Sequence, residues 1–249
     1  MKKKLTLFIL IFLIPVFAWA SGGLVFMSPG ESGDYLCPSG TYLFAWDGDY
    51  IDDSDKGCFT NGTVTKDGTL GGSGTIGAYG ESGSNGFWYT ADGDFLKWLV
   101  ASADGLDPTE GTIYMRIYMV TSAATEYVFE SYYNGTNFIY VRVLNSNEAG
   151  LGGQWSGNAY SDYSSSTVSD ATWTTIGVAW KYNEVGTDFS VTHDGTTWND
   201  KDKDFAADWA TDPAYLCLGT DYTGSGADDF YITKIVVLST FKESLPDWW

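Results

Sequence analysis

The stretch "GTIYMRIYMV" (residues 111–120) decides the class of fold, because its side chains alternate in character from one residue to the next. The odd-numbered positions are apolar and comprise Ile113, Met115, Ile117 and Met119. The even-numbered positions are aromatic or basic and comprise Tyr114, Arg116 and Tyr118. Successive side chains of a β-strand point to opposite faces, so this pattern predicts a strand with one face in a core.

Further strand patterns lie on both sides of this stretch. Segments 126–133 and 138–144 flank Asn134-Gly135, and segment 188–199 turns at Asp194-Gly195; both dipeptides favour hairpins. Apolar strands are also indicated at 41–47, 173–182, 214–220 and 230–238, whereas 94–103 fits a short helix or a bulged strand. The glycine- and serine-rich segment 68–86 is typical of loops. The chain therefore predicts an all-β, two-sheet antiparallel sandwich.

The two ends of the chain indicate export and set the expected domain limits. Three lysines at positions 2–4, the apolar run 5–17 and Ala18-Trp19-Ala20 are typical of a bacterial signal peptide. The apolar run is short for a membrane span, so we expect cleavage rather than an anchor. We expect a signal peptide at 1–20, an extension at 21–40, one sandwich domain at 41–241 and a tail at 242–249. The mature protein would then be secreted, in the periplasm, at the cell surface or outside the cell.

The charge of the chain excludes some partners. It has 13 basic and 32 acidic residues and a net charge of −19, which disfavours nucleic acid and anionic membranes. Acidic side chains offer oxygen ligands to hard cations, although a solvated surface explains most of them. Asp200, Asp202 and Asp204 alternate as in an EF-hand loop, but Phe205 stands where that loop needs glycine. We therefore expect a solvated loop there.

Three cysteines fit an oxidising compartment. Cys37 and Cys58 bracket the first strand pattern, and a disulfide between them would close a short loop. Closing a loop of about 20 residues contributes roughly 3 kcal/mol in the loop-entropy model. Cys217 lies in an apolar strand pattern and is expected to be a buried thiol.

The order of these segments resembles the concanavalin A-like, laminin-G-like jelly roll, over residues 42–241. The first strand ends in Asp47-Gly48, a turn of sequence Asp104-Gly105-Leu106 precedes the central strand, and a strand led by Trp173 precedes a hairpin. The acidic insertion 199–208 and the cysteine-containing extension depart from the family pattern. The resemblance implies a two-sheet antiparallel jelly-roll sandwich with its first and last strands side by side.

The resemblance also suggests a calcium site. Asp228 and Asp229 open the last strand, where carboxylates are costly to bury. In such sandwiches this acid often lies near the first strand and serves a structural calcium ion, and Asp47 is the expected partner of Asp228. Alternation places Asp228 on the face of Phe230. The alternative, that Asp228 only accepts backbone hydrogen bonds in a turn, stays open.

Catalytic patterns are weak. His193 is the only histidine, which excludes a histidine-based triad and a multi-histidine zinc site. Glu126 and Glu130 share a strand face by parity, but four strand residues separate them by about 13 Å. Glycosidase carboxyl pairs lie roughly 5–9.5 Å apart. We therefore expect no enzyme, with a glycoside hydrolase as the minor alternative.

The outward face of the central strands is the predicted ligand site. It comprises Tyr114, Arg116, Tyr118, Tyr140 and Arg142. Aromatic planes and fixed donors suit a sugar, which has a C–H face and hydroxyl groups; the alternative is that these side chains only pack under loops. Aromatic residues expected in loops form a second candidate surface and comprise Trp88, Trp155 and Tyr160.

The predicted function is a secreted, non-catalytic module that binds carbohydrate or another extracellular surface. The alternative is a structural or adhesive subunit of a cell-surface assembly, with a protein partner and self-assembly. The loops match no motif that names a ligand.

Overall fold

The computed structural model describes most of the sandwich. The described residues are 37–38, 40–48, 55–59, 62, 64–91, 93–100, 110–121, 124–134, 137–155, 158–181, 189–201, 214–219 and 229–249. They all belong to the larger of two compact units, Ser32–Trp249. The predicted signal peptide at 1–20 and most of the extension at 21–40 lie outside the described residues. Within the described part, none of the helices is both long and apolar enough to cross a membrane.

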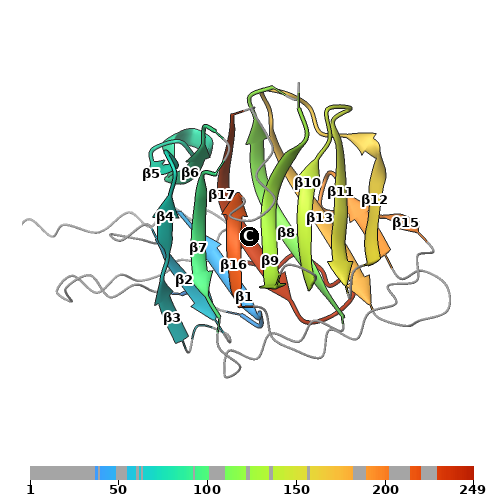
Figure 1. The fold of residues 1–249 in the computed structure, drawn as a ribbon, viewed down its shortest axis with the longest axis horizontal. Coiled ribbons are helices and arrows are strands. Elements are labelled where there is room, and N and C mark those ends of the chain that lie inside the picture. The colour runs from blue at the N-terminus through green and yellow to red at the C-terminus, as the bar shows by residue number, and fades with distance from the viewer. Residues whose placement is uncertain are drawn as a thin grey trace, which may run out of the picture. The chain divides into compact units, whose positions relative to one another are not determined.

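The described residues form two antiparallel sheets, which lie one behind the other in Figure 1. The ten-stranded sheet runs in the order β15 (Asn199–Lys201), β14 (Phe189–Thr192), β13 (Trp173–Lys181), β8 (Glu110–Met119), β17 (Phe230–Leu238), β1 (Phe44–Asp47), β2 (Lys56–Phe59) and β3 (Val64–Asp67), with β6 (Gly86–Tyr89) also paired to β17 and β5 (Thr75–Gly77) to β6. The seven-stranded sheet runs in the order β12 (Asn158–Thr167), β11 (Glu148–Trp155), β10 (Asn137–Val143), β9 (Glu126–Asn134), β16 (Tyr215–Gly219), β7 (Phe95–Leu99) and β4 (Thr69–Gly71). The predicted antiparallel sandwich is confirmed.

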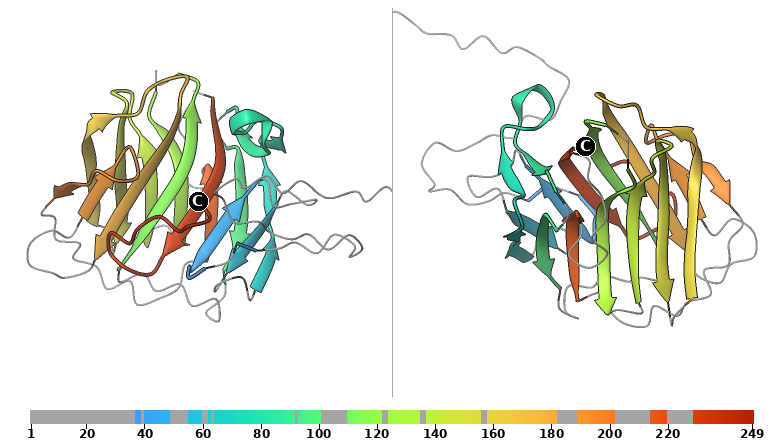
Figure 2. Two further views of the ribbon diagram at one scale, coloured as in Figure 1. Left: turned by 180° about the vertical axis from the view of Figure 1, so that it is seen from behind. Right: turned by 45° about the horizontal axis from the view of Figure 1, so that its top comes forward.

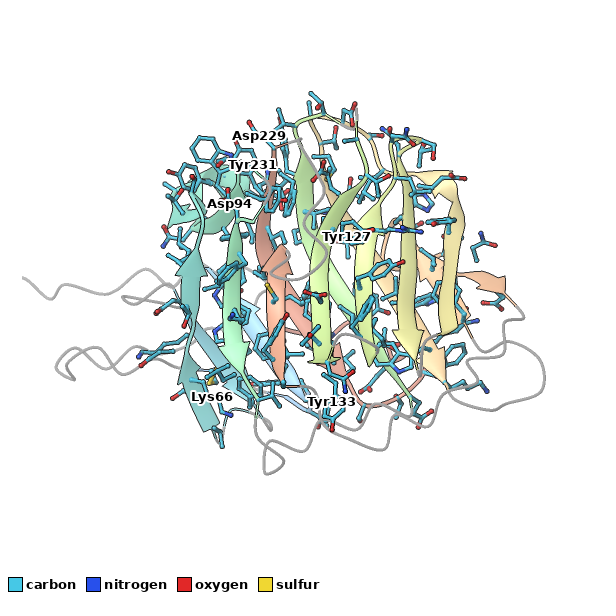
Figure 3. All side chains as sticks on the ribbon, viewed as in Figure 1. Lys66, Asp94, Tyr127, Tyr133, Asp229 and Tyr231 are labelled. Atoms are coloured by element: carbon cyan, nitrogen blue, oxygen red, sulfur yellow. A yellow bond between two sulfur atoms is a disulfide. The ribbon has the colours of Figure 1, made fainter. Side chains whose placement is uncertain are left out.

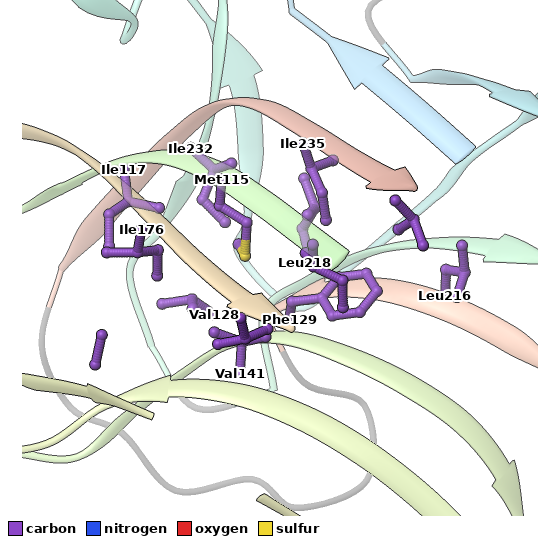
Figure 4. Packing of buried hydrophobic residues seen from close by; sticks show 14 of the residues in the cluster. Met115, Ile117, Val128, Phe129, Val141, Ile176, Leu216, Leu218, Ile232 and Ile235 are labelled. Carbon is purple, nitrogen blue, oxygen red and sulfur yellow. The ribbon is translucent and has the colours of Figure 1, made fainter. Parts of the chain in front are cut away.

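The core lies between the two sheets, and the alternation in β8 is confirmed. Met115 and Ile117 of β8 are fully buried and face Phe129 of β9 and Val141 of β10 across the sandwich, as Figure 4 shows. Complete burial of a side chain of this size contributes about 1.5–3 kcal/mol. The intervening positions of β8 point to the outer face of the ten-stranded sheet.

The first and last strands lie side by side, as the resemblance implies. β1 pairs with β17 in antiparallel register, with Phe44 opposite Val237 and Asp47 opposite Lys234. The segment at 94–103 contains a strand, β7, rather than a helix. The two predicted hairpins are also present, because β9 pairs with β10 and β14 with β15.

Several strands differ from the sequence interpretation because they are rich in glycine and serine. Segment 68–86 contains β4, β5 and the short 3-10 turn η1 (Glu81–Gly83) instead of loops alone. Trp88, Trp155 and Tyr160 belong to strands β6, β11 and β12, so their assignment to loops was wrong. Glycine in β11 has a packing reason, because a Cβ atom at Gly152 would collide with the ring of Tyr140. A neighbouring aromatic ring thus replaces the missing side chain.

The C-terminal segment crosses the outer face of the ten-stranded sheet, which Figure 2 (left) shows from behind. Trp248 and Trp249 pack there with Tyr42 and Leu245. Cys37 and Cys58 form a disulfide beneath this region, with their Cα atoms 5.8 Å apart. Cys217 is a buried thiol outside the disulfide, as expected.

Candidate ligand-binding surface

Four aromatic side chains form a row across four strands of the ten-stranded sheet. Trp88 of β6 lies opposite Tyr231 of β17, Tyr231 opposite Tyr118 of β8, and Tyr118 opposite Trp173 of β13. Directly opposite residues of an antiparallel pair project on the same face. Phe230 and Ile232, on either side of Tyr231, are buried in the core, so the four rings point outward. We call these four residues the aromatic row.

The rings of the aromatic row contact one another and remain partly exposed. Ring centroids lie 5.8 Å apart for Trp88–Tyr231, 5.7 Å for Tyr231–Tyr118 and 5.4 Å for Tyr118–Trp173. A fifth ring, Tyr79, lies 4.9 Å from Trp88 and 6.0 Å from Tyr231. With strands about 4.8 Å apart, the row extends about 14 Å across the sheet. It is therefore long enough to contact more than one sugar ring.

A fixed ion pair borders the aromatic row. The Arg116 guanidinium donates to the Glu81 carboxylate, with Nη2 2.6 Å from Oε1 and Nε 2.9 Å from Oε2. Its Nη1 also lies 3.3 Å from Thr175 Oγ1. The hydrogen bond from Arg116 is the main reason why the pKa of Glu81 lies below its usual value. The bidentate geometry holds both polar groups beside the rings.

The surroundings of Tyr231, within the aromatic row, are also polar. Figure 3 shows Tyr231 and Asp229 at the same end of the sandwich. Burial raises the pKa of the Tyr231 phenol, and the Asp229 carboxylate and the phenols of Tyr118 and Tyr79 raise it further. The Tyr231 hydroxyl group therefore stays protonated at neutral pH and can donate to a ligand.

Solved structures share this architecture, whereas no family model and no curated protein matches the sequence. The receptor binding domain of botulinum neurotoxin C/D mosaic serotype matches with a TM-score of 0.57 and 10% identity, over 83% of this chain and 49% of that chain. The serotype D ligand binding domain in complex with N-acetylneuraminic acid gives a TM-score of 0.57 and 10% identity, over 83% and 48%. The fold is a concanavalin A-like jelly roll.

A third match is botulinum neurotoxin type C, whose cell entry is dependent upon interaction with two ganglioside molecules. Its TM-score is 0.56 at 9% identity, over 83% of this chain and 49% of that chain. The jelly roll thus spans about half the length of these chains. Identity this low establishes the fold alone.

The jelly roll places the five predicted ligand residues on two different faces. Arg116 and Tyr118 of β8 belong to the surface around the aromatic row. Tyr114, on the same strand, is buried under the C-terminal segment, where its hydroxyl donates to the Glu243 carbonyl at 2.7 Å. Tyr140 and Arg142 belong to β10, on the outer face of the seven-stranded sheet. The five residues therefore do not form one surface.

Of the two predicted calcium ligands, Asp47 and Asp228, the structure describes only Asp47. Asp47 is 1% exposed, and its Oδ2 atom lies 3.1 Å from Nζ of Lys234, so a lysine already provides a positive charge there. Asp228 lies outside the described residues, and the calcium site stays a prediction. Among the described side chains, no group of three or more histidine, cysteine or carboxylate residues could hold a metal ion.

The carboxylates considered for catalysis lie on opposite faces of β9. Glu130 lies opposite Tyr140 on the outer face, whereas Glu126 lies opposite Val143, which is in the core. A register shift between Val141 and Arg142 separates them, so their assignment to one strand face was wrong. Both glutamates are fully buried. Asp202 and Asp204 of the acidic loop lie outside the described residues.

Sequence reasoning missed half of the aromatic row, the neighbouring ring of Tyr79 and one buried carboxylate. Tyr79, Trp173 and Tyr231 were not proposed as ligand residues, although Tyr231 alternates with apolar neighbours just as Tyr118 does. Asp94 is 1% exposed and accepts hydrogen bonds from the turn that follows β6. The sequence signal for this role was the position of Asp94 directly after Gly93, because aspartate and glycine are typical of turns in which the aspartate side chain accepts backbone hydrogen bonds.

Proposed function

We propose that this jelly roll is a secreted, non-catalytic module that binds a carbohydrate on the aromatic row. The observation that carries the proposal is the register of Trp88, Tyr231, Tyr118 and Trp173, which puts four partly exposed rings side by side. A pyranose ring has an apolar C–H face that packs on aromatic rings. Its hydroxyl groups can bond to the phenols and to the bordering ion pair.

The surface is organised before any ligand arrives. Each ring stands on a different strand of one sheet, and Arg116 and Glu81 fix each other through two hydrogen bonds. Rigid binding groups lose little conformational entropy on association, which favours affinity. Contiguous partly exposed aromatic groups on a folded surface are also typical of interaction sites.

Two further observations support parts of the proposal. The ligands of two matched neurotoxins, N-acetylneuraminic acid and gangliosides, are a sugar and sugar-bearing lipids, which supports carbohydrate binding at the level of the fold. The Cys37–Cys58 disulfide supports an oxidising, extracytoplasmic location.

A glycan array followed by calorimetric titration tests the proposal. Trp173→Ala should weaken the best glycan at least about tenfold, equivalent to about 1.4 kcal/mol. Tyr133→Ala is the matched control, because Tyr133 is 37% exposed and belongs to β9 of the other sheet. Equal effects of the two substitutions would contradict the proposal. An empty array combined with concentration-dependent light scattering would instead support the adhesive subunit.

A further inference from the structure

Arg142 lies among three tyrosine rings on the outer face of the seven-stranded sheet. Its guanidinium carbon is 4.8 Å from the ring centroid of Tyr163, 5.1 Å from that of Tyr140 and 6.0 Å from that of Tyr127. Tyr127 and Tyr140 meet edge to face, with centroids 4.9 Å apart. Figure 3 labels Tyr127 over the front sheet, which is the opposite face of the sandwich from the aromatic row. We call these four residues the arginine cage.

Glycines on the neighbouring strand make room for the arginine cage. Gly150 lies opposite Arg142, and Gly152 lies opposite Tyr140. A Cβ atom at Gly152 would collide with the Tyr140 ring. The tyrosine ring therefore lies against the backbone of β11, and the guanidinium rests beside it rather than extending into solvent.

Arg142 forms no ion pair among the described side chains, although the buried Glu130 lies opposite Tyr140 on the same face. Arg116 pairs with Glu81, Lys234 with Asp47 and Lys242 with Asp200, whereas Arg142 has only aromatic partners and the Tyr140 phenol. Its Nε atom is shielded from solvent without a hydrogen-bond partner in the described structure. In a chain with 32 acidic and 13 basic residues, an arginine without an ion pair is conspicuous. A partly desolvated cation is stabilised when an anion pairs with it.

We infer that the arginine cage is a second ligand site, which binds the carboxylate of an acidic sugar such as a hexuronate. The guanidinium can hold a carboxylate through two parallel hydrogen bonds. The three tyrosines add apolar ring surface and hydroxyl groups, which together suit a sugar ring. The net charge of −19 repels polyanions such as acidic peptides far more than a ligand with a single carboxylate.

Nuclear magnetic resonance titration of the full chain with glucuronate tests this inference. Glucuronate should bind, and its methyl ester, which keeps the ring but loses the charge, should bind at least about tenfold more weakly. Arg142→Gln should weaken glucuronate binding to the level of the ester. Arg142→Lys should retain part of the affinity, because it keeps the charge and loses only the bidentate geometry. Trp173→Ala, on the other sheet, should leave the ratio of the affinities for glucuronate and its methyl ester unchanged.

The inference is overturned if the wild-type protein fails to bind glucuronate, or if acid and ester bind equally. It is also overturned if Arg142→Gln binds as the wild type does, since the arginine would then serve packing alone. If Arg142→Gln unfolds, the comparison of acid with ester on the wild-type protein still decides. Equal binding of acid and ester by Trp173→Ala would place glucuronate on the aromatic row instead and would leave the proposed carbohydrate function intact.

Discussion

Replacing Asp94 by asparagine should destabilise the jelly roll where β6 ends. The carboxylate of Asp94 ties two turns together: its Oδ1 accepts from Ser73 N at 2.5 Å, and its Oδ2 accepts from Thr90 N at 2.8 Å and from Ala91 N at 3.0 Å. The Thr90 hydroxyl donates to the same Oδ2 atom at 2.8 Å. Thr90 directly follows β6, which carries Trp88 of the aromatic row, so this carboxylate also positions one end of the proposed site.

The expected loss follows from the four hydrogen bonds. In the Asp94→Asn variant, the new side chain could place its amide oxygen at the three donors around the former Oδ2 position, and its NH2 group would then face the Ser73 N–H. One charge-assisted hydrogen bond is lost, at about 1.5–3 kcal/mol, and three become neutral, at about 1 kcal/mol each before relaxation. With relaxation we expect a loss of about 4 kcal/mol, which lowers the melting temperature of a domain of this size by about 8–16 °C.

The pH dependence of the melting temperature distinguishes an effect of the Asp94 charge from an effect of side-chain packing alone. Burial alone would raise the pKa of Asp94, but the hydrogen bonds from Thr90, Ser73 and Ala91 lower it below its usual value. A carboxyl group with a depressed folded pKa stabilises fully above its unfolded pKa of about 3.9 and loses that contribution as pH falls through the folded pKa. The difference in melting temperature between wild type and Asp94→Asn should therefore be large near neutral pH and shrink as the solution is made strongly acidic.

Thermal unfolding followed by circular dichroism across that pH range measures the difference. The matched control is Asp67→Asn, because Asp67 is an exposed residue of β3 whose Lys56 ion pair at 2.5 Å contributes little in water. Equal melting temperatures of wild type and Asp94→Asn at neutral pH would refute the reasoning. A difference that persists unchanged at low pH would show that the carboxylate charge is not its cause.

Two further predictions concern an ion and a covalent bond. If calcium binds between Asp47 and Asp228, a chelator should lower the melting temperature and added calcium should restore it, because a bound ion stabilises the folded state by mass action. Asp228→Asn should remove this dependence on calcium. A melting temperature that does not change with the chelator would show that no such ion binds. Alkylation of the unfolded, unreduced protein followed by mass spectrometry should label Cys217 and leave Cys37 and Cys58 unlabelled. Three labelled cysteines would contradict the disulfide.

The architecture could be predicted because its strongest signals are local. The alternation in residues 111–120 depends only on the period of an extended chain, and the pairs Asn134-Gly135 and Asp194-Gly195 depend only on turn geometry. Strands β4, β5, β11 and β12 could not be predicted in the same way. Their glycine- and serine-rich sequences resemble loops. In β4 and β11 the packing comes from aromatic side chains of neighbouring strands, Phe95 at Gly71 and Tyr140 at Gly152.

The candidate site could be predicted only in part, because its residues meet through strand pairing. Tyr118 and Arg116 stood out within one alternating strand, whereas Trp88, Tyr231 and Trp173 come from strands far apart in the sequence. Their common surface depends on the register of three separate strand pairs. A slip of one residue in any of these pairs would turn a ring into the core.

Arg116 and Arg142 show most directly how the partner strand decides the chemistry of a residue. Each follows a tyrosine two positions earlier in an alternating strand, as Tyr114-Met115-Arg116 and Tyr140-Val141-Arg142. Across the strand pair, Arg116 meets a threonine and is held by Glu81, so its charge is neutralised within the protein. Arg142 meets a glycine and three tyrosine rings, which contact the guanidinium without neutralising it. One local pattern thus gives a structural ion pair on one face of the jelly roll and, on the other face, a cation that can receive the charge of a ligand.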